Sequence, residues 1–123
     1  MADPRHVLGR AAEAAVERWL CAAGWRILAR RIRPTTGGGE IDLVALDPSG
    51  VLVAVEVRAR RSRRAGAAAA SVDARRVRRL GRALAAIGPM SRWPHAGLRV
   101  DLVTVEPTDV PGRWRLTRLP SIG

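Results

Sequence analysis

The feature that most constrains the fold of this chain is a four-residue turn between two apolar segments. Residues 47–50, with the sequence DPSG, fit a type I turn, which favours Asp first, Pro second and Gly fourth. A glycine in the fourth place can take a left-handed conformation, and this closes a three-residue hairpin loop with a bulge. Such a loop pairs Asp47 with Val51, and the turn therefore predicts the register of the whole hairpin.

This register brings charged side chains together inside apolar sequence. Asp42 is expected opposite Glu56, and Glu40 opposite Arg58. Directly opposed Cβ atoms lie about 4.5–5.5 Å apart, and two ionised carboxylates repel each other at that separation. A raised pKa, a neighbouring arginine or a bound divalent cation would each relieve the repulsion. Mg²⁺ commonly takes one or two protein carboxylates, and a metal so held can polarise a phosphodiester and activate water.

The same spacing has a purely structural interpretation. Glu40 and Arg58 would then form a cross-strand ion pair, with Asp42 and Glu56 on a solvated sheet edge. Exposed pairs of this kind contribute only about 0–1 kcal/mol to stability. The spacing alone leaves both interpretations open.

The rest of the pattern predicts one α/β domain over residues 1–123. The expected elements are a helix from Asp3-Pro4 to about Ala23, strands over 25–33, 40–46 and 51–58, a helix over 71–87 capped by Ser71, and strands over 98–106 and 113–119. The order α-β-β-β-α-β-β makes the second helix a crossover that brings the fourth strand in parallel, within a mixed sheet flanked by helices. Residues 60–70, "RRSRRAGAAAA", are expected to be the most mobile loop.

The net charge of the chain indicates which class of partner it binds. The net charge is +11, and all 22 basic residues are arginine. Such a balance predicts a polyanionic partner, with nucleic acid ahead of an anionic membrane surface. Cys21 is the only cysteine, which excludes a disulfide framework and a CxxC zinc site and favours a cytoplasmic setting. No stretch resembles a signal peptide or a membrane span, so no membrane association is expected.

Two groups of arginines are candidates for contacts with a nucleic-acid backbone. One group directly follows the hairpin and the other lies on the second helix. The candidates are Arg60, Arg61, Arg63 and Arg64 in the first group, and Arg75, Arg76, Arg79 and Arg82 in the second. The alternative is a solvated charged face with no ligand.

The chain has no Phe or Tyr, so base stacking would depend on its four tryptophans. Trp19 and Trp25 fall on apolar patterns and are expected in the core. Trp93 is placed in a loop where it could stack on a base or cover the core, and Trp114 is left undecided. Asp101 fits a strand-entry or helix-capping role as well as a site role.

Three motifs resemble the YraN family of small uncharacterised bacterial proteins (uncharacterised bacterial protein family 0102). They are "GEIDLVA" at 39–45, "VAVEVRAR" at 53–60 and "RVDLVTV" at 99–105, and "AGWRIL", "SVDARRVRRL" and the closing "SIG" extend the similarity over nearly the whole chain. The resemblance implies a restriction-endonuclease-like fold. The sites of that fold follow an Asp…(Asp/Glu)-x-Lys pattern on such a hairpin.

By this resemblance Asp42 and Glu56 would bind Mg²⁺ or Mn²⁺. Glu13 matches a first-helix glutamate that often joins such sites, and Arg76 matches a basic residue of the second helix. Glu40 is a further candidate to assist. Arg58 stands where the pattern has lysine. A guanidinium stays protonated at any accessible pH, so Arg58 cannot act as a general base, although it can donate hydrogen bonds to a phosphate.

The leading hypothesis is therefore a nucleic-acid-binding protein whose nuclease fold is implied by the resemblance, with metal-dependent endonuclease or phosphodiesterase activity left open. Two alternatives remain. One is a non-catalytic DNA- or RNA-binding module that retains the fold, and the other is an assembly factor that docks on an acidic protein.

Overall fold

The computed structural model describes residues 4–34, 39–59, 74–87 and 96–120. Its elements are α1 (Pro4–Ala22), β1 (Arg26–Ile32), β2 (Ile41–Leu46), β3 (Leu52–Ala59), α2 (Ala74–Ile87), β4 (Leu98–Pro107) and β5 (Trp114–Leu119). The strands form one sheet in the order β1-β2-β3-β4-β5. Only the β3–β4 pair within it is parallel. The predicted α/β class, element order and parallel crossover are confirmed, whereas the predicted loop over 60–70 and the cap at Ser71 lie outside the described residues.

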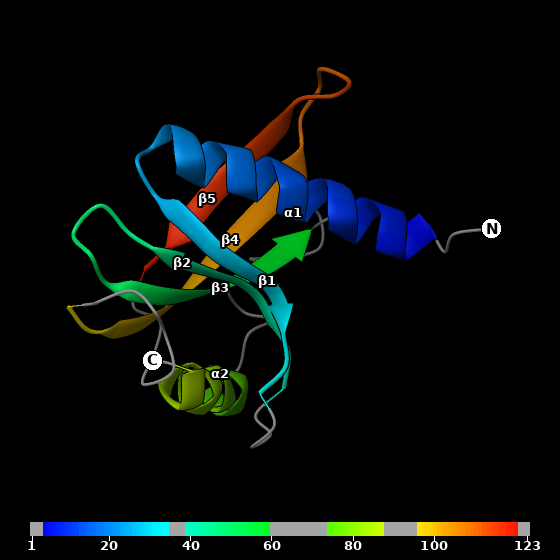
Figure 1. Ribbon diagram of the computed structural model, residues 1–123. Helices are drawn as coiled ribbons and strands as arrows, with labels where there is room; N and C mark the ends of the chain where they lie inside the picture. Colours follow the sequence, from blue (N-terminus) through cyan, green and yellow to red (C-terminus); the bar gives the residue numbers. More distant parts are fainter. Residues whose placement is uncertain (1–3, 35–38, 60–73, 88–95, 121–123) are drawn as a thin grey trace.

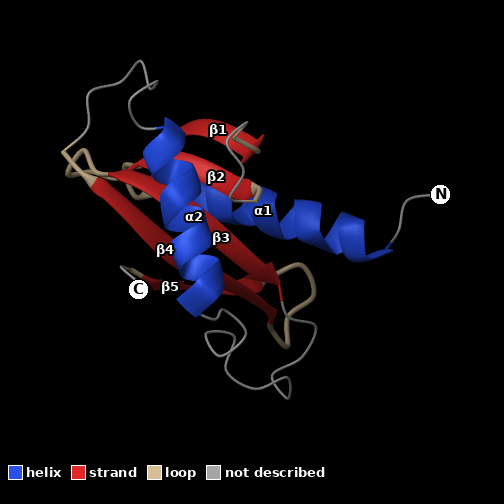
Figure 2. Ribbon diagram, turned by 90° about the horizontal axis from the view of Figure 1, so that it is seen from below, coloured by secondary structure: helices blue, strands red, loops and turns tan. Residues whose placement is uncertain are grey.

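One helix covers each face of the sheet (Figures 1 and 2). Side chains alternate across β3, the central strand: Val53 and Val55 join the core under α1, and Leu52 and Ala54 join the core under α2. Residues Leu52–Glu56 are all buried. This is typical of a strand covered on both faces. The two helices thus divide the polar residues of the sheet into two separate environments.

The end of α1 is set by glycine. Gly24 has a φ of 90°, and the N–H of Trp25 donates to the carbonyl of Leu20 at 3.0 Å while the N–H of Gly24 donates to Cys21 at 3.1 Å. These two bonds form a Schellman motif, in which a left-handed residue satisfies the last carbonyls of a helix. Leu20 and Trp25 are both buried in the core under α1. The motif therefore directs the chain from the helix into β1.

The β2–β3 turn has the predicted geometry. The N–H of Gly50 donates to the carbonyl of Asp47 at 2.9 Å, and Gly50 has a φ of 86°. The carboxylate of Asp47 accepts the N–H of Ser49 at 2.8 Å and that of Val51 at 3.0 Å. The loop sets the register that follows, with Leu43 opposite Val55 and Leu46 opposite Leu52.

The described part of the chain contains no helix that is both long and apolar enough to cross a membrane.

Candidate functional site

Asp42 and Glu56 lie on the face of the sheet that α2 covers. Val44 and Ala54 face each other and pack in the core under α2. Asp42 lies two residues before Val44, and Glu56 lies two residues after Ala54. A step of two residues along a strand returns the side chain to the same face of the sheet. The carboxylate of Asp42 accepts the N–H of Val57 at 2.8 Å and so joins the two strands beyond their regular ladder. The register predicted from the turn is confirmed.

Glu56 is buried and held by two arginines. Its side chain is only 2% exposed, and Nη2 of Arg76 donates to Oε1 at 3.0 Å and to Oε2 at 3.1 Å. Nη2 of Arg58 lies 3.5 Å from Oε1. A buried carboxylate is tolerated when it is paired and hydrogen-bonded. This burial contradicts the interpretation that places Glu56 on a solvated edge.

The carboxyl group of Asp42 is an unusually weak acid. Burial raises the pKa of its carboxyl from 3.8 to about 7, and the charge of Glu56 and more weakly that of Glu13 add to the rise. The hydrogen bond from Val57 and the charge of Arg76 oppose it. A pKa of about 7 means that near neutral pH the acid pair carries fewer than two negative charges. A cation at this position would favour the fully ionised form.

The other two predicted metal ligands have partners of their own. Glu13, on α1, accepts Nε of Arg31 at 3.1 Å and Nη2 at 2.8 Å. Glu40 precedes β2, and its Oε2 lies 3.5 Å from Nη2 of Arg33. The predicted pairing of Glu40 with Arg58 is not what the structure shows, because the ladder of β2 ends before Glu40 and Arg58 turns to Glu56.

Within the described ranges, no three acidic, histidine or cysteine side chains are grouped so that they could hold a metal ion. The structure brings Asp42 and Glu56 together but does not bring Glu13 and Glu40 into one group with them. Metal binding by these residues stays a prediction.

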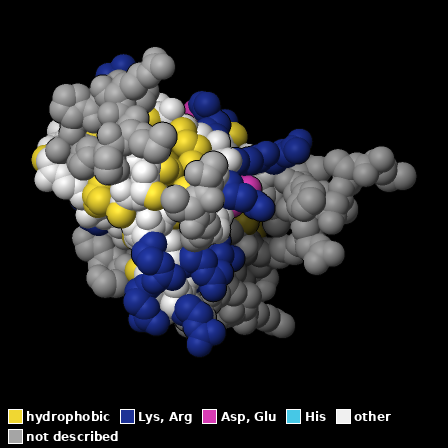
Figure 3. Space-filling model, turned by 60° about the horizontal axis from the view of Figure 1, so that its bottom comes forward, with side chains coloured by type: hydrophobic (Ala, Val, Ile, Leu, Met, Phe, Trp, Pro, Cys, Tyr) yellow, Lys and Arg dark blue, Asp and Glu magenta, His cyan; other side chains and the backbone are white. Residues whose placement is uncertain are grey.

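The arginines of α2 form a basic surface beside the acid pair. Arg75, Arg79 and Arg82 are exposed, whereas Arg76 is partly buried against Glu56. Figure 3 shows basic side chains gathered on the side of the molecule where α2 lies. Their spacing places them along the outer part of the helix, while Leu80, Ala83 and Leu84 face the sheet. The other four candidate arginines, Arg60, Arg61, Arg63 and Arg64, lie outside the described residues.

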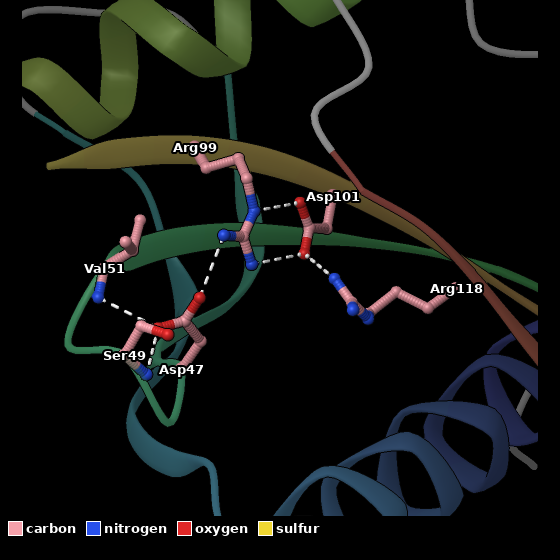
Figure 4. A network of polar contacts seen from close by, with 6 residues as sticks. All are labelled: Asp47, Ser49, Val51, Arg99, Asp101 and Arg118. Atoms are coloured by element: carbon pink, nitrogen blue, oxygen red, sulfur yellow. Dashed lines mark hydrogen bonds and ion pairs between the residues drawn. The ribbon is translucent and has the colours of Figure 1, made fainter.

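A second polar cluster lies under α1, on the opposite face of the sheet (Figure 4). Asp101 is fully buried and accepts Nε of Arg99 at 2.7 Å, Nη2 of Arg99 at 3.0 Å and Nη1 of Arg118 at 2.9 Å. Arg99 also donates to Asp47 at 2.9 Å, which ties the β2–β3 turn to β4. Both guanidiniums lie over the ring of Trp25, at 5.8 and 5.3 Å from its centroid.

This cluster decides the role that the sequence left open for Asp101: it links strands and lies away from the acid pair. Sequence reasoning missed its partners. The spacing of Arg99 and Asp101, which puts both on one face of a strand, was the available signal.

The predictions for the tryptophans have mixed outcomes. Trp25 is 8% exposed and lies in the core, as predicted. The prediction for Trp19 is wrong, because its side chain is 38% exposed. The buried stripe of α1 runs through Ala12, Val16 and Leu20, and Trp19 is turned away from it. Trp114 is partly buried against the core under α1, and Trp93 lies outside the described residues.

Comparison with known proteins places this site in a family. The sequence profile of the uncharacterised protein family UPF0102 matches residues 12–105, which include both acids and α2. A UPF0102 protein of Paracidovorax citrulli is 54% identical over 65 residues, which are 52% of this chain and 48% of that protein. UPF0102 proteins of Burkholderia thailandensis and Burkholderia pseudomallei are 49% and 46% identical over 71 residues, which are 58% of this chain and 48% of each relative. The matched part thus spans about half the length of these curated relatives.

Proposed function

The chain belongs to the uncharacterised protein family UPF0102, and we propose a function from the site itself: binding of nucleic acid and metal-dependent cleavage of its phosphodiester bonds. The observation that carries the proposal is the meeting of Asp42 and Glu56 beside the arginines of α2. A nuclease needs carboxylates for a cation and positive charge for the phosphate backbone, and here both lie on one face.

The acid pair suits a magnesium-like cation. Oxygen ligands from one or two carboxylates, completed by water and substrate phosphate, are the usual environment of Mg²⁺. Asp42 and Glu56 would supply the protein ligands, and the raised pKa of Asp42 reflects burial and a repulsion that a cation would relieve. Bound there, Mg²⁺ or Mn²⁺ would polarise a phosphodiester and activate a water.

Arg58 would bind the phosphate rather than move a proton. It lies two residues after Glu56, on the same face of β3, and its side chain is 34% exposed. A guanidinium held in this way can donate to a phosphate oxygen and stabilise negative charge as it develops. The resemblance to a restriction-endonuclease-like fold, whose sites carry lysine at this position, supports a role for Arg58 in the reaction.

The test is a cleavage panel over single-stranded, duplex and branched DNA and RNA, with Mg²⁺ or Mn²⁺. Asp42→Asn should abolish cleavage while leaving binding equal or stronger, because the substitution removes a negative charge beside the phosphate. The matched control is Asp109→Asn, an acid-to-amide change at an exposed residue of the β4–β5 connection. Cleavage that survives in Asp42→Asn at the wild-type rate would refute the assignment.

The second candidate is a non-catalytic nucleic-acid-binding module. It is favoured by the engagement of Glu56 with two guanidiniums and by the lack of a third acid in the group, among the residues described. Calorimetry separates the two functions, because a module would bind DNA or RNA without binding Mn²⁺. An Arg58→Lys protein that gains activity would show that the native chain is an impaired enzyme.

A further inference from the structure

Arg76 connects the basic helix with the acid pair. It comes from α2, while Glu56 comes from β3, and the two are 20 positions apart in sequence. A single nitrogen, Nη2, contacts both carboxylate oxygens, at 3.0 and 3.1 Å. The side chain of Glu56 is 2% exposed and that of Arg76 is 34% exposed. The guanidinium therefore covers the two oxygen atoms through which Glu56 would ligate a cation.

We propose that Arg76 is a positioning residue that gates this site: it neutralises Glu56 in the unliganded protein and must leave the carboxylate before a divalent cation binds. The inference rests on the proposed function, since it concerns the same acid pair. Its physical basis is competition, because the guanidinium uses a lone pair on each oxygen and its positive charge repels a divalent cation brought to the remaining ones.

The position of Arg76 on α2 indicates what would open the gate. Arg75 and Arg79 are its neighbours on the helix and are exposed. Residues three apart on a helix have Cβ atoms about 5–6 Å apart, so a phosphate held by Arg79 lies within reach of the long side chain of Arg76. Phosphate accepts the planar guanidinium fork as well as carboxylate does. Nucleic acid on α2 would therefore draw Arg76 away from Glu56 and prepare the metal site.

Arg58 does not have this role. It lies on the same strand as Glu56, at 3.5 Å, and does not hold both oxygens. A shift of α2 or a new partner on α2 would leave Arg58 in place. The gate is thus a contact between two elements, and linkage requires that nucleic acid and metal strengthen each other's binding through it.

The first experiment measures Mn²⁺ affinity by calorimetry in the absence of nucleic acid, for the wild type, Arg76→Gln and Arg113→Gln. Arg113 is exposed and precedes β5, so its substitution matches the loss of charge without touching the site. We expect Arg76→Gln to bind Mn²⁺ about 5- to 10-fold more tightly than the wild type, because one partly exposed competitor is gone. Arg113→Gln should resemble the wild type.

The second experiment measures the affinity for duplex DNA by fluorescence anisotropy, with and without Mn²⁺. Mn²⁺ should strengthen DNA binding more in the wild type and in Arg113→Gln than in Arg76→Gln. The last variant lacks the guanidinium through which the two ligands are coupled. Comparing ratios within each protein cancels the general effect of the ion on DNA.

Two results would overturn the inference, and they differ in what they leave standing. Equal Mn²⁺ affinities in the wild type and Arg76→Gln refute the gate and preserve the metal site. Failure of every variant to bind Mn²⁺ refutes both the gate and the proposed metal chemistry. If Arg76→Gln does not fold, Arg76→Lys provides the same test. It keeps the charge, but the shorter lysine side chain ends before the position of Nη2 and should hold Glu56 less firmly, so this variant should bind Mn²⁺ about threefold more tightly.

Discussion

Replacing Asp42 by asparagine should stabilise this protein, and the gain should grow with pH. Asparagine resembles the protonated acid in shape and carries no charge, and its side-chain oxygen can still accept the N–H of Val57. In the folded protein the pKa of Asp42 is raised from 3.8 to about 7, chiefly by burial and secondly by Glu56. The unfolded chain lacks both effects, so its Asp42 ionises near pH ~4.

The direction follows from proton binding. Between about pH 4 and about pH 7 the folded state keeps a proton that the unfolded state has lost, so the wild type loses stability as pH rises through this window. Below it both states are protonated, and above it both are ionised. The free energy of unfolding of Asp42→Asn minus that of the wild type should therefore rise from near zero at about pH 4 to a plateau above about pH 8.

The size of the plateau comes from the shift. A rise of roughly three pKa units, at about 1.4 kcal/mol per unit, corresponds to about 4 kcal/mol. Asp42 is only partly buried, and water and local relaxation screen part of this energy. We expect a plateau of about 2–4 kcal/mol.

The assay is urea denaturation at steps of pH, with a chelator present so that no cation joins the acid pair. The control is Asp47→Asn. Burial tends to raise the pKa of Asp47, but the hydrogen bonds from Val51, Arg99 and Ser49 lower it overall. Its stabilising charge is lost only in acid, so Asp47→Asn should destabilise the protein by a constant amount from about pH 5 to about pH 8. A flat difference for Asp42→Asn over that range would refute our account of the site.

Two further predictions concern the other charged groups. Asp101→Ala should lower the free energy of unfolding by about 3–5 kcal/mol in urea denaturation, because it removes the buried partner of two arginines; a loss below about 1 kcal/mol would mean that the cluster is well hydrated without it. Changing Arg75, Arg79 and Arg82 together to glutamine should reduce the log–log salt slope of duplex-DNA binding by about 2.7, because each phosphate that an arginine neutralises contributes about 0.9 to the slope. An unchanged slope between about 50 and about 200 mM salt would show that α2 does not touch the DNA backbone.

Two features of the fold could be predicted from sequence because they depend on neighbouring residues. The DPSG turn needs only an Asp side chain, a Pro ring and a Gly backbone in succession, and these determine which residues of β2 and β3 face each other. Gly24 ends α1 for a similarly local reason. The pairing of Asp42 with Glu56 follows from the turn, and it is the one part of the candidate site whose position local chemistry could predict.

The partner of each charged side chain could not be predicted in the same way. Arg76 reaches Glu56, Arg31 reaches Glu13, and Arg33 rather than Arg58 lies beside Glu40. Arginine side chains are long and alike, and any of them can meet an acid that the fold brings within reach. The choice depends on how each helix is set on the sheet and on which strands lie side by side.

The amino-acid sequence was sufficient for the class of fold, the hairpin register and the excess of positive charge, since these follow from local backbone preferences, periodicity and composition. The packed molecule was needed to establish that Glu56 is buried under Arg76, that Asp101 joins a separate cluster and that Trp19 faces outward. The first and the last depend on the packing of α2 and α1 against the sheet, and the second depends on which strands lie side by side. For the acids, distances of a few ångströms separate an ion pair from a solvated charge.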